Sequence, residues 1–301
     1  MVRLIVTSED SGKKVTAFLE EILPGLTKSA IKRMLRTGDI RINGEKYKKD
    51  QPLQNRDVVE AYVPVELERA PLLDICYEDK NMIVLNKQPG TLVTGVANIH
   101  APDLLSMVIN YMRDGGEYSE EMGIIPFPCY RLDIYTGGLV VFAKNGDMFE
   151  LLKEALRQRR VKRIFQAIVK GCPPGEDGEF QHFYVKDGDD KYRVSGKKIR
   201  GAVPIYTKYR VLRSNGSYSL IEVEPVTGYM NQERAHMEAA GYPILGDGMY
   251  GDARINKKLG LRYQALWCSS VEFTTGINNM LEYINGKQIY TDDINFPLIN
   301  I

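Results

Sequence analysis

A single carboxylate stands where an apolar strand is about to begin. In YRLDIYTGGLVVFAKN, residues 130–145, Asp133 is followed by a Thr-Gly-Gly turn and then by the apolar run 139–143. Such a carboxylate can attack an electrophilic carbon or take a proton, and it can equally cap a turn. The neighbouring residues leave both a catalytic and a purely structural role open at this point.

Metal and redox chemistry find little support in the composition. The chain has only three histidines, and its four cysteines, Cys76, Cys129, Cys172 and Cys268, lack the paired spacing of zinc or redox motifs. We therefore expect no metal site, and reduced thiols as in a cytoplasmic protein. No apolar run approaches the length of a membrane span, and the sequence turns acidic and polar too soon after Met1 for a signal peptide.

The length of the chain favours more than one domain. Its 301 residues exceed one typical domain, and 44% apolar with 26% charged residues is the composition of a soluble protein with a packed core. The net charge of +1 argues neither for nor against a nucleic-acid partner, because local clusters of charge decide such binding.

Residues 1–62 have the pattern of a small separate module. Apolar residues at helical spacing predict one helix near 15–22 and a second whose buried face is formed by Ile31, Met34 and Leu35. Asn43-Gly44 then predicts a tight hairpin. A basic stripe beside the buried face of the second helix is either a solvated surface or a contact for phosphates, and it consists of Lys28, Lys32, Arg33 and Arg36.

This module resembles the alpha-L RNA-binding domain of a small-subunit ribosomal protein, tyrosyl-tRNA synthetases and many RNA-modifying enzymes. The resemblance rests on the two short helices, the basic stripe, Gly-Asp-Ile-Arg-Ile-Asn-Gly (38–44) and Arg-Asp-Val-Val (56–59). It implies contacts that position RNA through its phosphates without reading its sequence. These contacts are expected from Lys28, Lys32, Arg33, Arg36 and Arg41.

A larger domain is predicted over residues 74–301, joined to the module by a linker at 63–73 that has two prolines and no clean period. Its short strand patterns with interspersed helices predict an α+β domain around a mixed, mainly antiparallel sheet with flanking helices. The strands are expected at 81–87, 139–143, 164–169 and on both sides of Asn215-Gly216, and the helices at 148–156 and 231–241. The first helix leads into a basic cluster, residues 157–163, that either complements the helix dipole or faces RNA.

Four stretches of this domain resemble the RluA family of RNA pseudouridine synthases. In chain order they are NKQPG (86–90), YRLDIYTGG (130–138), KRIFQAIVKG (162–171) and VTGYMNQERAHMEAAGYPILGDGMYGD (226–252). The resemblance spans roughly residues 74–275, and an alpha-L domain ahead of such a catalytic domain is a common family arrangement. The family signature is His-Arg-Leu-Asp, two variable residues and Thr-Ser-Gly, and its catalytic Asp corresponds to Asp133.

The resemblance implies the isomerisation of uridine. The bond between the base nitrogen and ribose must break, the base must turn, and its carbon 5 must bond to the sugar, with no metal or cofactor required. Asp133 either attacks the anomeric carbon or takes the ribose 2′ proton. A buried carboxylate keeps its charge beside a cation. Arg234 matches the family arginine that supplies this charge, and the alternative interpretation is an ordinary surface helix arginine.

Three further residues take roles from the resemblance. A uridine in folded RNA must be flipped out of its stack, and Arg131 corresponds to a residue that helps to fill the vacated space. Lys87 matches the lysine of the family's Asn-Lys-Pro-x-Gly, and is expected either to line the RNA cleft or to be an ordinary loop lysine. Phe165 aligns with a family tyrosine, and it can stack on uracil but has no hydroxyl to take the carbon-5 proton. Another branch of the synthases also has phenylalanine there.

The motifs depart from the family at several positions, and each change removes a contact to substrate or scaffold. The family's His, Ser, Arg, His and His are replaced, in chain order, by Tyr130, Gly137, Tyr229, Asn231 and Trp267. A hydroxyl from Tyr229 or Tyr135 is a candidate to replace the one that Phe165 lacks.

The sequence therefore predicts an active RNA pseudouridine synthase, with ribosomal RNA as the expected substrate and transfer RNA as the alternative. The competing interpretation is a catalytically impaired RNA-binding protein that retains the synthase fold. The joint survival of Asp133 and Arg234 favours the enzyme, because drift after loss of catalysis has no reason to spare both. We expect a monomer without a membrane partner.

Overall fold

The computed structural model describes residues 2–8, 10–22, 28–62, 73–95, 103–187, 192–291, 294 and 296. The chain separates into two compact units, Met1–Leu72 and Leu73–Ile301. The predicted linker lies outside the described residues except for residue 73, so its bounds stay a prediction.

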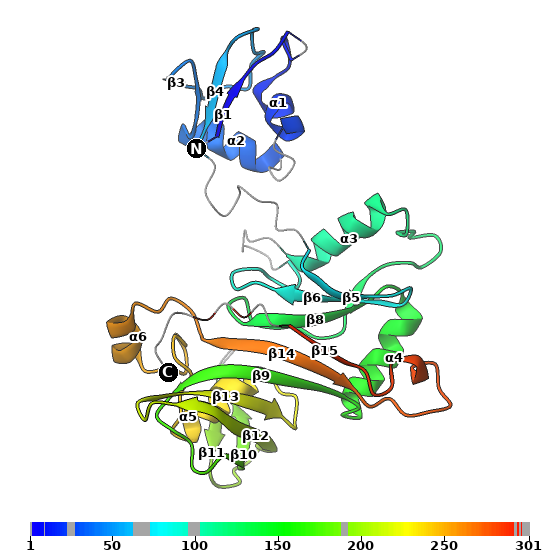
Figure 1. Ribbon diagram of the computed structural model, residues 1–301, viewed down its shortest axis with the longest axis vertical. Coiled ribbons are helices and arrows are strands. Elements are labelled where there is room, and N and C mark those ends of the chain that lie inside the picture. Colours follow the sequence, from blue (N-terminus) through cyan, green and yellow to red (C-terminus); the bar gives the residue numbers. More distant parts are fainter. Residues whose placement is uncertain are drawn as a thin grey trace. The chain divides into compact units, whose positions relative to one another are not determined.

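The first unit is a four-stranded sheet covered by two helices (Figure 1). The strands lie in the order β1-β4-β2-β3. Phe18, Leu19 and Ile31 are fully buried in its core, as the helical spacing predicted. The elements are β1 (Val2–Ile5), α1 (Val15–Ile22), α2 (Lys28–Thr37), β2 (Ile40–Ile42), β3 (Glu45–Lys46) and β4 (Val58–Ala61).

The hairpin and the basic stripe of this unit are present. Asn43 and Gly44 have φ values of 56° and 85°, so both adopt the left-handed conformation that a tight hairpin turn requires. Arg41 on β2 is half-buried, with its guanidinium 5.0 Å from the centre of the Tyr62 ring. The side chains of the stripe are exposed along α2, and they are Lys28, Lys32, Arg33 and Arg36.

The second unit is built on an 11-stranded sheet that confirms the predicted α+β class. Its main path is β11-β10-β12-β13-β9-β14-β8-β6-β5, with β7 paired to β8 and β15 to β14. The pairing is antiparallel except between β14 and β8. The strands are β5 (Ile75–Glu78), β6 (Met82–Lys87), β7 (Phe127–Pro128), β8 (Gly137–Ala143), β9 (Val161–Lys170), β10 (Asp177–Lys186), β11 (Tyr192–Ser195), β12 (Val203–Ser214), β13 (Tyr218–Pro225), β14 (Leu266–Phe273) and β15 (Gln288–Tyr290).

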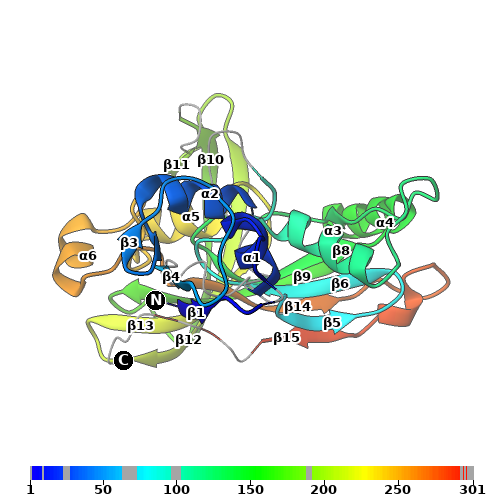
Figure 2. The same ribbon diagram turned by 90° about the horizontal axis from the view of Figure 1, so that it is seen from above.

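Helices cover part of this sheet. Helix α4 buries Met148, Leu152 and Ala155 against β8 and β9, and Figure 2 shows α3 on the same side of the sheet as α4. Helix α5 contacts β11, β12 and β13. Among the described residues, no helix is long and apolar enough to cross a membrane. The helices are α3 (Leu104–Asp114), α4 (Gly146–Arg157), α5 (Gln232–Ala239) and α6 (Ala253–Leu259), with a short 3-10 helix, η2 (Glu282–Ile284).

The start of β8 is held in very close contact with β14. Gly137 pairs with Trp267, and Gly138 pairs with Cys268. A Cβ atom at Gly137 would lie 2.2 Å from the indole ring, and one at Gly138 would lie 2.3 Å from the Cys268 carbonyl oxygen. Only glycine fits at these two positions. The strand therefore fixes the loop directly before it, which carries Asp133.

Candidate active site

Asp133 lies in the loop between β7 and β8 and faces a cleft. The loop is closed by the Thr136 amide, which donates to the Asp133 carbonyl oxygen at 3.0 Å, and it is anchored by Leu132, which packs in the core. The Asp133 side chain is 33% exposed. The turn role and the cleft-facing carboxylate therefore coexist, because the backbone makes the turn while the side chain stays free for other contacts.

Arg234 holds this carboxylate. It lies on α5, and its Nη1 donates to Asp133 Oδ2 at 2.7 Å, which confirms the predicted ion pair between residues 101 positions apart. The Arg234 side chain is only 10% exposed. Arg234 is therefore a buried cation behind Asp133, which lines the cleft, and it is not a surface helix residue.

Asp247, which the sequence analysis did not single out, fixes the guanidinium. Its two carboxylate oxygens accept from Arg234 Nε at 2.7 Å and from Nη2 at 2.8 Å, and Oδ1 also accepts from the amides of Met249 and Tyr250. Burial raises the pKa of Asp247, but the hydrogen bonds and charge of Arg234, together with the amides of Tyr250 and Met249, hold the pKa below its usual value. The Gly-Asp-Gly turn, 246–248, was the sequence signal available for it.

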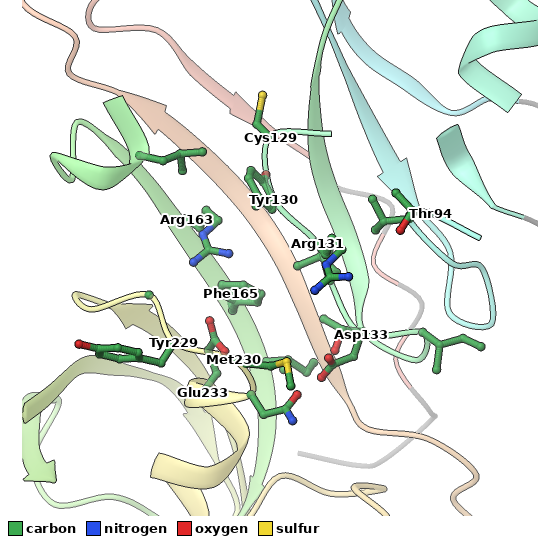
Figure 3. A pocket seen from close by; sticks show the side chains of 18 of the residues that line it. Thr94, Cys129, Tyr130, Arg131, Asp133, Arg163, Phe165, Tyr229, Met230 and Glu233 are labelled. Carbon is green, nitrogen blue, oxygen red and sulfur yellow. The ribbon is translucent and has the colours of Figure 1, made fainter. Parts of the chain in front are cut away.

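The cleft has a volume of about 670 Å³ and is lined from several elements (Figure 3). Phe165 of β9 forms part of one wall, as predicted, and Arg131 extends an exposed side chain into the cleft beside Asp133. Arg163, two residues before Phe165 on the same strand, also lines it. Its guanidinium lies 4.9 Å from the centre of the Tyr130 ring. Of the basic cluster 157–163, Arg157 at the end of α4 and Arg163 on β9 thus line the cleft.

Glu233 is a second carboxyl group in this cleft, and the sequence motifs did not predict it. It stands in the first turn of α5, directly before Arg234, and is 9% exposed. Burial raises the pKa of Glu233, while the charges of Arg163 and Arg234 act in the opposite direction. The sequence signal was a charged residue between Gln232 and Arg234 in an otherwise familiar motif.

Lys87 does not line the cleft, and the expectation of an RNA contact is wrong for this residue. Its side chain is completely buried, and Nζ donates to the carbonyl oxygens of Thr91 at 2.8 Å, Ile134 at 2.9 Å and Gln88 at 3.3 Å. Burial lowers the pKa of Lys87 to about 7, although the nearby charge of Asp133 raises it. Lys87 ties the loop that carries Asp133 to the loop after β6.

The two tyrosines considered as hydroxyl donors differ in position. Tyr229 lines the cleft, but Figure 3 shows its hydroxyl directed away from Phe165. Tyr135 stands outside the cleft lining, with its ring stacked against Tyr263 at 6.0 Å. Neither tyrosine presents a hydroxyl at the Phe165 wall.

The arrangement is suited to a planar, uncharged ring attached to a phosphate-bearing chain. A carboxylate with one fixed cationic partner stands in the same cleft as an aromatic ring, and Arg131 and Arg163 add positive charge of the kind that suits phosphate groups. Within the described residues, no group of three or more His, Cys, Asp or Glu side chains is arranged to hold a metal ion.

Comparison with known proteins identifies RNA pseudouridine synthases. The family model of RNA pseudouridylate synthases matches residues 81–239. Ribosomal large subunit pseudouridine synthase C of Escherichia coli is 29% identical over 291 residues, covering 89% of this chain and 87% of that protein. Synthase D of Borreliella burgdorferi is 31% identical over 211 residues, or 70% and 64% of the two chains. The solved structure of human RNA Pseudouridylate Synthase Domain Containing 4 matches with a TM-score of 0.58 at 26% identity, covering 72% of this chain and 87% of that one.

Proposed function

This chain belongs to the RNA pseudouridylate synthase family, and we propose that it converts uridines of ribosomal RNA to pseudouridine with Asp133 as the catalytic carboxylate. Family membership makes it an RNA pseudouridine synthase, an isomerase whose partner is RNA. The observation that carries the catalytic role is the 2.7 Å ion pair between Asp133 and Arg234 at the edge of the cleft.

The geometry supports this role because one side of the Arg234 guanidinium is anchored by Asp247 and the other side binds Asp133. Two nitrogens of Arg234 are used by Asp247, so the third is held rigidly toward Asp133. A bidentate partner fixes the plane of a guanidinium better than a single contact does. The Asp133 carboxylate is thereby oriented while one part of it remains open to a bound nucleotide.

The reaction follows from where these groups stand. A uridine flipped into the cleft would place its base against Phe165 and its sugar beside Asp133. The carboxylate then bonds to the anomeric carbon or takes the ribose 2′ proton, and the base leaves, turns and re-attaches through carbon 5. Arg131, exposed next to Asp133, is proposed to occupy the gap left in the RNA stack.

Ribosomal RNA is the proposed substrate for two reasons. The relatives from Escherichia coli and Borreliella burgdorferi are named as synthases of the large ribosomal subunit. The first unit carries the exposed basic stripe on α2, and we propose that it is an alpha-L domain that contacts RNA phosphates.

The test of activity and target is a deletion of the gene in its host. Pseudouridines in all ribosomal and transfer RNAs are mapped by carbodiimide labelling and primer extension, before and after return of the wild-type gene. We expect one or a few large-subunit ribosomal positions to lose pseudouridine and regain it. Loss of pseudouridine in transfer RNA alone would show that transfer RNA is the substrate. No change at any position would favour an RNA-binding protein without catalysis.

A further inference from the structure

Glu233 is a cleft carboxyl group to which the scheme above gives no role. It is 9% exposed, and among the described residues no hydrogen bond or ion pair joins its side chain to another residue. Burying a carboxyl group without a direct hydrogen bond or ion pair costs free energy, and the charges of Arg163 and Arg234 offset that cost only in part. A carboxyl group in this position, at the wall of the cleft, is a candidate for a role in the reaction.

Glu233 stands at the wall of the cleft that has no free tyrosine hydroxyl to accept a proton. Phe165 offers an aromatic face and no hydroxyl, Tyr229 points away, and Tyr135 does not line the cleft. Tyr130 lines the cleft, but its hydroxyl is engaged with the Leu139 carbonyl oxygen at 2.9 Å. Figure 3 shows the Glu233 carboxylate on the same side of the cleft as the Phe165 ring, with Asp133 on the other side. A base stacked on Phe165 would therefore have Asp133 toward its sugar and Glu233 toward its ring edge.

We propose that Glu233 is the general base that removes the proton from carbon 5 of the turned uracil. This inference rests on the proposed function, in which Asp133 serves the sugar. It divides the chemistry between two carboxyl groups, one for the carbon–nitrogen bond and one for the carbon–hydrogen bond. The family's tyrosine hydroxyl is thereby replaced by a carboxylate from the neighbouring helix α5.

The step balances without any added reagent. The bond from N1 to the sugar breaks and leaves its electron pair on the base, and carbon 5 then bonds to the anomeric carbon. As that bond forms, Asp133 leaves the anomeric carbon with its electron pair, or returns the 2′ proton to the ribose if it had taken one. Carbon 5 now carries both its hydrogen and the sugar. Glu233 takes that hydrogen as a proton, and the electron pair of the carbon–hydrogen bond restores the double bond between carbons 5 and 6. N1 takes one proton from water, and Glu233 later releases its own proton to water. The net change is an isomerisation.

The charges around Glu233 suit a base of moderate strength. Burial raises the pKa of this carboxyl group, the positive charges of Arg163 and Arg234 lower it, and Asp133 raises it further. Cys268 and Tyr184 are the other titratable groups that interact with it. A carboxylate whose pKa lies above its ordinary value accepts a proton from carbon more readily than an exposed one.

The test uses the full-length protein and total RNA from a strain that lacks the gene, labelled at carbon 5 of its pyrimidines with tritium or deuterium. Tritium released to water reports the loss of the carbon-5 proton, and pseudouridine is measured in the same RNA. We expect Glu233→Gln to slow single-turnover release by about 100-fold to 10,000-fold with unchanged RNA affinity. The deuterium isotope effect should grow, because proton removal becomes rate-limiting.

A second variant separates a chemical role from a structural one. Phe165→Tyr returns a hydroxyl to the wall, and in the Glu233→Gln background it should recover part of the rate. A wild-type rate in Glu233→Gln would overturn the inference, and so would a slower rate with an unchanged isotope effect and no recovery by Phe165→Tyr. If Asp133→Asn is inactive in the same assay, the proposed function still stands. Absence of tritium release by the wild type would contradict the proposed function itself.

Discussion

At the scale of single residues, Arg234 is the centre of the candidate site. Its guanidinium uses three nitrogens on two carboxylates, with Asp247 behind it and Asp133 in front. A lysine has the charge but not the planar fork, so it cannot hold both partners at once. We predict that Arg234→Lys lowers the turnover rate by about 100-fold, the cost of a small misplacement of a catalytic group, with RNA affinity nearly unchanged.

Single-turnover kinetics and filter binding of the same variant check this prediction. Asp247→Asn is the matched variant, because it keeps the shape of the side chain but weakens the hydrogen bonding to the guanidinium. It should also lower the turnover rate. A wild-type rate in Arg234→Lys would show that charge alone is enough.

Lys87 gives a prediction about pH. Its pKa is about 7 in the folded protein, against an ordinary value of 10.5. Between these values the unfolded chain binds a proton that the folded protein does not, so the folded state gains stability as pH rises. The free energy of unfolding of the wild type relative to Lys87→Met should increase by about 1.4 kcal/mol per pH unit above pH 7. Urea unfolding at several pH values measures it, and parallel curves for the two proteins would refute it.

The sequence was informative for some of these residues and silent for others. Asp133 and Arg234 stood in motifs with a chemical meaning, so their contact was predictable although 101 positions separate them. Lys87 stood in a motif too, but the motif could not tell a buried lysine that binds carbonyl oxygens from one facing RNA. Asp247 and Glu233 gain their importance only from neighbours that the fold brings to them.

At the scale of elements, the parallel pair β8 and β14 explains two departures from the family motif. The family's Ser is Gly137 and its late His is Trp267, and these residues pair directly across the two strands. The indole occupies the space that a side chain at Gly137 would need. The two departures are therefore coupled changes in packing and do not by themselves indicate lost catalysis.

This coupling is measurable by a double-mutant cycle. Gly137→Ser should cost about 2 kcal/mol of stability through overpacking against the indole. In a Trp267→His background the same change should cost less, with a coupling of about 1 kcal/mol or more. Urea unfolding of the four proteins gives the value, and strictly additive costs would contradict the explanation.

Local patterns predicted most elements, because the sequence signals of hairpins and amphipathic helices lie within short stretches of the chain. The Asn43-Gly44 turn, the buried strand β8, helix α4 and the β12–β13 hairpin are all found. The pairing of β8 with β14 was not predictable from the pattern. β8 is a continuous apolar run, β14 mixes apolar residues with two serines and a glutamate without regular alternation, and nothing local chooses their partner.

At the scale of the whole molecule, the basic stripe on α2 should contribute to RNA affinity and not to catalysis. Replacing Lys28, Lys32, Arg33 and Arg36 by Gln should weaken RNA binding and reduce the slope of log affinity against log salt by about 3, since each lost phosphate contact accounts for roughly 0.7 to 0.9. Turnover at saturating RNA should stay unchanged. The exposed pair Lys257 and Lys258 on α6 is the control, and an equal loss there would remove the case for the stripe.

The central claim is that Asp133 performs the chemistry at the sugar. The most direct measurement is single-turnover pseudouridine formation by purified wild type and Asp133→Asn on RNA from the deletion strain, with RNA affinity measured in parallel. Asparagine keeps the size of the side chain but can neither attack nor accept a proton. We predict a loss on the order of 10,000-fold or more in rate with RNA affinity retained. A rate within tenfold of the wild type would contradict the account.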